Sequence, residues 1–128
     1  MKQVMLLGNK LKKNVIMGYN LSCLGDDRAY SLIKGPNGKD LSFYALNSLL
    51  KSKKNYKIYD FTQRGSDERQ YCAPGIDLPI VGFCRSKYGE YKEYHTSKDN
   101  LKIISEKSLE QSLGILKKLV DICELSLF

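Results

Sequence analysis

Apolar and polar positions follow two patterns along the chain. Short apolar runs at residues 14–24, 56–61 and 78–84 are rich in β-branched and aromatic residues and predict strands, the first and last of them buried on both faces. Apolar residues spaced three or four positions apart predict amphipathic helices at 40–52 and from Ser105 onward. The predicted order is therefore strand, helix, strand, long loop, strand, long loop, helix.

Both predicted helices have recognisable start signals. Asp40 and Ser105 each stand where an N-cap is expected, and Glu106 lies in the first turn of the second helix, where the helix dipole favours a negative charge. The second helix also has one apolar stripe, which is the pattern of a helix packed against a core. The members of this stripe are Leu109, Leu113, Leu116, Leu119 or Val120, and Cys123.

Strands that alternate with helices predict an α/β fold with a mixed, mostly parallel sheet and flanking helices. The length of 128 residues predicts one domain, 1–128. Ligands in such folds bind beyond the carboxyl ends of strands. Three loops next to predicted strand ends, at 25–28, 65–70 and 94–99, are rich in ionisable residues. We expect these loops to converge at one edge of the sheet and to form the site.

The chain contains one histidine, His95, and it lies in the third of these loops. It follows Tyr94 and precedes a turn in which Thr96 and Asp99 could orient the ring through hydrogen bonds. A surface position, a general base and a metal ligand are all open for such a residue. Zinc accepts both imidazole nitrogen and carboxylate oxygen, and the other loops supply carboxylates. These are Asp26, Asp27, Asp67 and Glu68.

Net charge, cysteine spacing and hydropathy limit the kinds of partner and compartment that the sequence predicts. The net charge of +7 permits nucleic-acid binding, but the lysines are spread in pairs rather than gathered in one stripe, which argues against nucleic acid as a partner. The four cysteines form no C-x-x-C pair and are expected to be buried, reduced thiols. No apolar run approaches the roughly 18 residues of a membrane span. We therefore expect a cytoplasmic protein without a membrane partner.

Three segments resemble a known family. The segments GDDRAYS (25–31), RGSDERQYC (64–72) and YGEYKEYHTS (88–97) are similar to segments of the co-catalytic zinc aminopeptidases, within them to a bacterial aminopeptidase-like branch. The resemblance covers the chain from about residue 9 to its end. It implies a fold that is part of a zinc-aminopeptidase-like domain, of the phosphorylase/hydrolase-like kind.

The resemblance also implies roles for individual residues. His95 would bind one zinc ion, and Ser22 stands where the family has a zinc-binding aspartate. Asp26 or Asp27 is the candidate to replace that aspartate, although a turn or helix cap is the alternative for both. Arg69 suits a carboxylate or a carbonyl, because its guanidinium can make paired hydrogen bonds. The implied substrate-binding residues are Ser66, Asp67, Glu68, Arg69 and Tyr71.

The family's chemistry requires more groups than this sequence offers. A two-zinc site needs a histidine on each metal and a Glu-Glu pair, whereas the chain has one histidine and no Glu-Glu dipeptide. No catalytic residue is therefore assigned, and the chain is expected to resemble only the C-terminal half of the catalytic domain. Zinc binding by the chain alone is expected to be weak or absent.

Two functions remain open on these grounds. The first is a zinc-dependent aminopeptidase-like hydrolase, incomplete and inactive as this chain alone; the alternative is a non-catalytic remnant that binds a peptide or another ligand. Either would take a peptide or an amino-acid-containing substrate. Because half a sheet exposes unpaired strand edges, we also expect a homo-oligomer or a complementing partner chain.

Overall fold

The computed structural model describes residues 2–127, with side chains from 7 to 126. Short 3₁₀ helices occur at Phe61–Gln63 and Leu101–Ile103. No helix in the described range is long and apolar enough to cross a membrane. The helices and strands, in chain order, are α1 (Lys2–Asn14), β1 (Gly18–Leu21), β2 (Tyr30–Ile33), α2 (Leu41–Leu50), β3 (Tyr56–Tyr59), α3 (Glu68–Tyr71), β4 (Ile80–Cys84) and α4 (Glu106–Leu127).

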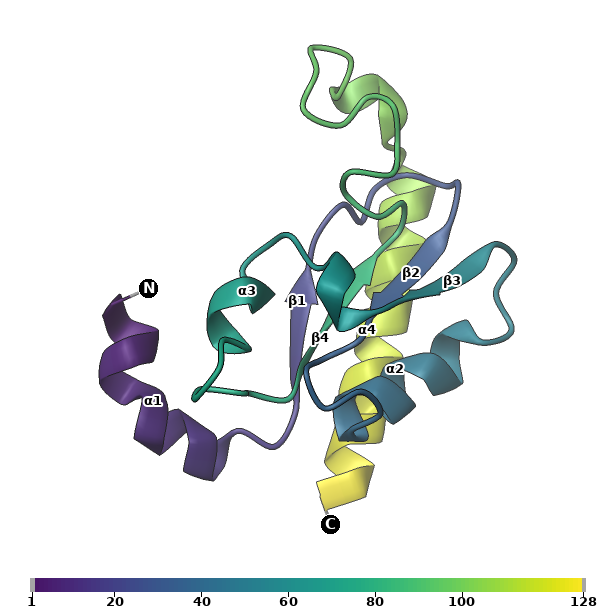
Figure 1. The fold of residues 1–128 in the computed structure, drawn as a ribbon. Coiled ribbons are helices and arrows are strands. Elements are labelled where there is room, and N and C mark those ends of the chain that lie inside the picture. The colour runs from purple at the N-terminus through teal and green to yellow at the C-terminus, as the bar shows by residue number, and fades with distance from the viewer. Residues whose placement is uncertain (1, 128) are drawn as a thin grey trace.

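The four strands form one sheet in the order β1-β4-β2-β3 (Figure 1). β1 pairs with β4 in parallel, and β2 pairs with β3 in parallel. These two parallel pairs meet at an antiparallel junction between β2 and β4, where Leu32 lies opposite Phe83. The predicted α/β fold with a mixed, mostly parallel sheet and flanking helices is therefore confirmed.

One face of the sheet packs against α2 and α4, and α4 runs along the back of the sheet in Figure 1. Side chains alternate along each strand, so Leu32, Val81 and Phe83 all point to this face. Each fully buried side chain of this size contributes roughly 1.5–3 kcal/mol of hydrophobic stabilisation. The helices add Phe43, Ala45, Leu46, Leu50, Ile115 and Leu119 to this core.

The opposite face is covered by loops and by the short helix α3 rather than by a long helix. Ile33 and Cys84 point to this side and pack with Tyr88, which lies just after β4. Cys23 and Tyr94 pack around the same small cluster. The polar loops singled out in the sequence therefore lie close to this loop-covered face.

Both predicted helix caps are confirmed. The carboxylate of Asp40 accepts a hydrogen bond from the backbone N–H of Phe43 at 3.0 Å, and α2 begins at the next residue, Leu41. The hydroxyl oxygen of Ser105 accepts from the N–H of Ser108 at 3.2 Å, and α4 begins at Glu106. Each contact satisfies one of the N–H groups that the first turn of a helix leaves unpaired.

Three elements lie where no strand or helix is predicted, namely α1, β2 and α3. β2 is the most informative of these, because the sequence suggests a loop at 25–31 and a turn at 33–40, and both are wrong where they overlap the strand, at Tyr30, Ser31 and Ile33. The strand is only four residues long, and its last three residues are buried. Its conformation is fixed by pairing with β3 and β4 on its two sides, which a local sequence pattern does not encode.

The predicted apolar stripe of α4 is wrong in its first half. Leu109 and Leu113 are 46% and 51% exposed, whereas Ser108 and Ser112 are buried. A hydrogen bond explains why these serines are buried instead of the leucines. The Ser112 hydroxyl donates to the carbonyl of Leu24 at 2.8 Å, and this contact turns the serine face of α4 toward the loop after β1.

Candidate functional site

The chain around the first ionisable loop meets the chain just before the third one beyond the carboxyl ends of β1 and β4. Nη1 of Arg28 donates to the carboxylate of Glu93 at 3.0 Å, and the Cys23 sulfur lies 3.6 Å from the Tyr91 hydroxyl. Figure 1 shows the segment after β4 projecting past these strand ends. Parallel strands bring their carboxyl ends to one edge, and this is where ligands of α/β sheets commonly bind.

The second loop reaches the same region by a different route. β3 is parallel to β2, and β2 is antiparallel to β4, so β3 ends at the opposite edge of the sheet from β1 and β4. The second loop therefore does not leave its strand at the edge where the first and third loops meet. The chain after β3 crosses to the other pair of strands, where Glu68 bonds to Asn20 of β1 and to Tyr88 after β4.

Glu68 is a buried carboxylate, 2% exposed, and it organises the second loop. It accepts hydrogen bonds from the Tyr88 hydroxyl, the Asn20 amide and the backbone N–H groups of Gly65 and Ser66. Burial raises the pKa of Glu68, but the bonds from Tyr88, Gly65 and Ser66 outweigh it and hold the pKa below its usual value. Its oxygens are thus occupied by the protein.

The other predicted substrate-binding residues lie around this buried anchor. Asp67 and Arg69 are exposed, while Ser66 and Tyr71 are half-buried. They therefore leave polar groups accessible on the loop, in contrast to Glu68, which points inward. A role for these residues in binding a substrate stays a prediction.

Asp26 and Asp27 have opposite environments although they are neighbours. Asp26 is 5% exposed, and its carboxylate accepts from the N–H and the hydroxyl of Ser86 at 3.2 and 3.0 Å. It also accepts from the backbone N–H of Arg28 at 3.0 Å, which closes a local turn, and from the Arg28 guanidinium at 3.4 Å. Asp27 is exposed. Asp26 therefore joins the loop after β1 to the segment after β4.

Arg28 connects the two loops through charge. Its guanidinium lies between the carboxylates of Asp26 and Glu93 and 5.2 Å from the centre of the Tyr91 ring. The bond to Glu93 is the main cause of the raised pKa of Arg28, and the same bond lowers the pKa of Glu93. Both groups therefore stay charged at neutral pH, and the pair holds the third loop against the first.

His95 is exposed and stacks on its neighbour Tyr94, with ring centres 4.0 Å apart and planes at 16°. Thr96 and Asp99, expected to orient the imidazole, bond elsewhere: Thr96 donates to the Glu93 carbonyl at 2.6 Å, and Asp99 accepts from Tyr91 at 3.0 Å. The backbone of His95 is left-handed, with φ 58°. The Tyr94 face, rather than a hydrogen bond from the turn, therefore positions the ring.

The described residues by themselves do not fit a complete zinc centre. Across the part of the chain that the structure describes, no three histidine, cysteine, aspartate or glutamate side chains are grouped to hold a metal. A catalytic zinc normally has three protein ligands, and the carboxylate of Asp26 is already engaged by Ser86 and Arg28. Zinc binding by His95, Asp26 and Asp27 stays a prediction.

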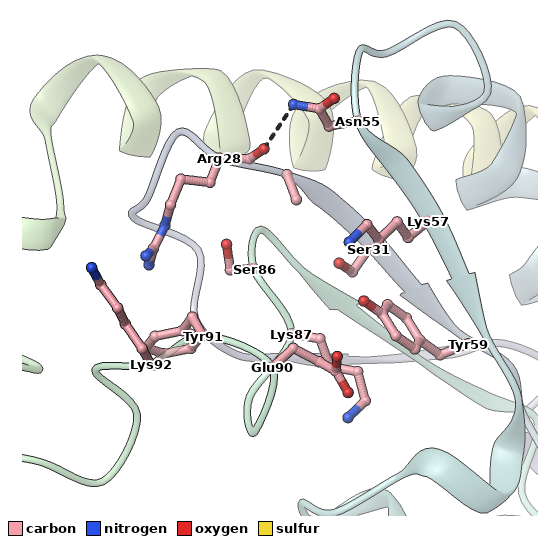
Figure 2. A pocket seen from close by; sticks show the side chains of 11 residues that line it. Arg28, Ser31, Asn55, Lys57, Tyr59, Ser86, Lys87, Glu90, Tyr91 and Lys92 are labelled. Atoms are coloured by element: carbon pink, nitrogen blue, oxygen red, sulfur yellow. Dashed lines mark hydrogen bonds between the residues drawn. The ribbon is translucent and has the colours of Figure 1, made fainter.

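Sequence reasoning missed a pocket of about 510 Å³ beside these loops (Figure 2). It lies between the segment after β4 and the starts of β2 and β3. Four cationic side chains line it, together with a single carboxylate, Glu90. The cations are Arg28, Lys57, Lys87 and Lys92. The signal in the sequence is the run Arg-Ser-Lys at 85–87, which directly follows a buried strand.

Arg85 is a second residue that the sequence did not single out. It is 2% exposed, and its guanidinium donates to the carbonyl of Ala29 at 2.9 Å and to the side chain of Gln111 at 3.3 Å. The guanidinium also lies 3.9 Å from the centre of the Tyr30 ring. It therefore joins α4 to the start of β2 beneath the site.

Two solved structures share the fold. A candidate peptidase from Clostridium acetobutylicum matches 95% of this chain with a TM-score of 0.85 and 30% identity. An aminopeptidase from Aneurinibacillus sp. strain AM-1 matches 93% of the chain with a TM-score of 0.67 and 20% identity. The chain covers 29% and 28% of these two proteins, so it corresponds to less than a third of either.

The sequence comparisons agree with this likeness. A Clostridium acetobutylicum protein, named for polysaccharide biosynthesis and an aminopeptidase-like domain, is 36% identical over 101 residues. That match covers 78% of this chain and 23% of the relative. The family described as "Domain of unknown function (DUF4910)" matches residues 4–126. This chain, with its peptidase-like α/β fold, therefore belongs to the DUF4910 family.

Proposed function

We propose that this chain forms part of an aminopeptidase-like hydrolase domain, in which zinc-dependent cleavage of a peptide bond requires groups beyond the residues described. The observation that carries the proposal is the meeting of the three aminopeptidase-like segments. Arg28 bonds to Glu93, and Glu68 bonds to Tyr88, so segments far apart in sequence share one site. The fold shared with the candidate peptidase of Clostridium acetobutylicum supports it.

In this proposal the chain holds the frame of the site and one side of the substrate. The buried carboxylates of Asp26 and Glu68 keep two of the loops in place. Arg69 is exposed on the second loop, where its guanidinium can pair with the carboxylate of a peptide or another amino-acid-containing substrate. The chain alone is then expected to bind such a substrate without cleaving it.

The activity of the purified chain tests this division of roles. Aminoacyl p-nitroanilides should release no p-nitroaniline above the blank, with or without added zinc, and His95→Asn should behave identically. Asparagine is the matched replacement because it tolerates the left-handed backbone found at His95. Zinc-dependent release that disappears in His95→Asn would show a complete enzyme and would overturn the proposal.

Binding of an uncleaved dipeptide tests the substrate side. Leu-Gly titrated into the labelled chain should shift amide resonances near residues 64–72, and Arg69→Gln should weaken the binding about tenfold, as expected for one lost charge-assisted contact. Lys118→Gln is the control, because Lys118 is exposed on α4. Equal affinity in Arg69→Gln and the parent chain would remove Arg69 from the site.

We also propose a strand partner for β1. Within the described residues β1 pairs with β4 along one side, and its outer residue Leu21 is 46% exposed. An unpaired strand edge is a template for another strand, from a second copy or from a complementing chain. Light scattering should give twice 14.6 kDa if a second copy pairs here, and Leu21→Lys should return the mass to 14.6 kDa. If light scattering gives the mass of a monomer, the proposed partner is a complementing chain, which co-purification would identify.

A further inference from the structure

The basic pocket described above carries an excess of charge that the protein does not neutralise. Among the described residues, Lys57, Lys87 and Lys92 form no ion pair, whereas Arg28 pairs with Asp26 and Glu93. Figure 2 shows Lys57 on one side of the cavity and Arg28 with Lys92 on the other. Cations held around a concave space raise the local potential and attract an anion.

Lys87 is the strongest indication, because it is buried. It is 7% exposed, and its ammonium donates to the carbonyl of Tyr88 at 3.1 Å. Its Nζ lies 4.7 Å from the Tyr88 ring centre and 5.3 Å from the Tyr59 ring centre. Aromatic faces stabilise a cation without neutralising it. An ammonium has three donors, and a carbonyl accepts without neutralising its charge, so the charge of Lys87 stays unpaired beside the pocket.

A neutral hydroxyl complements these cations. Tyr59 lines the same pocket, and burial, followed by the Glu90 carboxylate, raises its pKa. Tyr59 therefore stays protonated at neutral pH and can donate a hydrogen bond. The single carboxylate in the lining, Glu90, can accept from an amine or hydroxyl elsewhere on the same ligand. The volume of about 510 Å³ suits a small molecule of the size of a dipeptide or a sugar phosphate.

We propose that this pocket binds a small ligand through carboxylate or phosphate groups that pair with Lys57 and Lys92 (Figure 2), while the buried charge of Lys87 adds to the positive potential of the cavity. The proposal goes beyond the hydrolase function, because none of the residues assigned to zinc or to the peptide substrate lines this cavity. Lys57 comes from β3, and the two other lysines come from the segment after β4. The site therefore depends on the antiparallel pairing of β2 with β4, which places the starts of β2 and β3 at the same edge of the sheet as the end of β4.

Isothermal titration at constant ionic strength tests the proposal with two separate probes, inorganic phosphate and glutarate. At least one of them should bind saturably with one site per chain. Lys57→Gln and Lys92→Gln should each weaken that binding about tenfold, the loss of one charge-assisted hydrogen bond. Both lysines are exposed, so these variants should fold, which circular dichroism checks. Lys117→Gln, an exposed lysine on α4, is the matched control and should leave the affinity unchanged.

Each outcome decides the matter. Phosphate alone, glutarate alone or both would support an anion site and would identify the group that it recognises. The absence of saturable binding for both probes would overturn it. An equal loss of affinity in Lys117→Gln would also overturn it, because the binding would then follow net charge rather than the pocket.

Discussion

The carboxylate of Glu68 accepts a hydrogen bond from the hydroxyl of Tyr88, although twenty residues separate them along the chain. The same hydroxyl accepts from the backbone N–H of Gly65 at 3.0 Å. Tyr88 therefore bonds both to the start of the second loop and to its buried carboxylate. This arrangement joins two of the aminopeptidase-like segments at the site.

Tyr88→Phe should lower the free energy of unfolding by about 1–3 kcal/mol, because the buried Glu68 carboxylate loses a donor and the Gly65 N–H loses one of its two acceptors. Urea denaturation of the variant and the parent chain measures the difference. Tyr44→Phe is the control: Tyr44 is 57% exposed, and a change within about 0.5 kcal/mol is expected. Equal losses in the two variants would contradict the role given to the Tyr88 hydroxyl.

Acid should remove the contribution of Glu68 to stability. Its pKa in the folded chain lies below the usual value of 4.5, so its stabilisation is complete above that value and is lost as the pH falls through the folded pKa. Glu68→Gln should therefore be less stable than the parent chain at neutral pH. Below about pH 4.5 its free energy of unfolding should fall less steeply with pH than that of the parent chain. Urea denaturation at a series of pH values measures both effects. Glu124→Gln, an exposed glutamate on α4, should keep the parent slope.

Asp26→Ala and Asp27→Ala form a matched pair of neighbouring substitutions. Loss of Asp26 leaves the buried N–H and hydroxyl of Ser86 without their acceptor, and a cost of about 2–3 kcal/mol is expected. Loss of the exposed Asp27 should change stability by less than about 0.5 kcal/mol. Thermal and urea unfolding check the pair. A larger loss of stability in Asp27→Ala than in Asp26→Ala would contradict the structural role given to the Asp26 carboxylate.

The four thiols should differ in reactivity. Cys72 and Cys84 are each 1% exposed, and burial raises the pKa of Cys72 to about 11 and that of Cys84 to about 12. Cys23 and Cys123 are only half-buried. A disulfide reagent at pH 8 should therefore modify two thiols quickly in the native chain and all four in urea. Rapid modification of two thiols in the native variant that carries both Cys72→Ser and Cys84→Ser would assign them to Cys23 and Cys123.

Local signals were sufficient for much of the fold. Asp40 and Ser105 mark the starts of α2 and α4 because a cap depends on residues only three positions away. β2 was missed because its conformation depends on pairing at both sides with strands distant in sequence. The exposed positions of Leu109 and Leu113 were missed for a similar reason, since the contact of Ser112 with Leu24 sets the face of α4.

The site was predictable at the level of segments and less so at the level of side chains. The motif at 64–72 located the second loop, but the inward turn of Glu68 depends on Asn20 and Tyr88, which are far from it in sequence. The same limit applies to Asp26, which is buried only because Ser86 is folded over it. The basic pocket has only the short run at 85–87 as a signal, because Lys57 reaches the same cavity as Lys87 only through the sheet order.

The pairing of β1 with β4 has a consequence for synthesis of the chain. Gly18 pairs with Ile80, and β1 has no other strand partner among the described residues, so within this part of the chain β1 must wait for β4. During translation, β1 leaves the ribosome with its apolar residues uncovered until β4 has also emerged. Pairings this distant form slowly, and nascent polypeptides in that condition are common clients of chaperones.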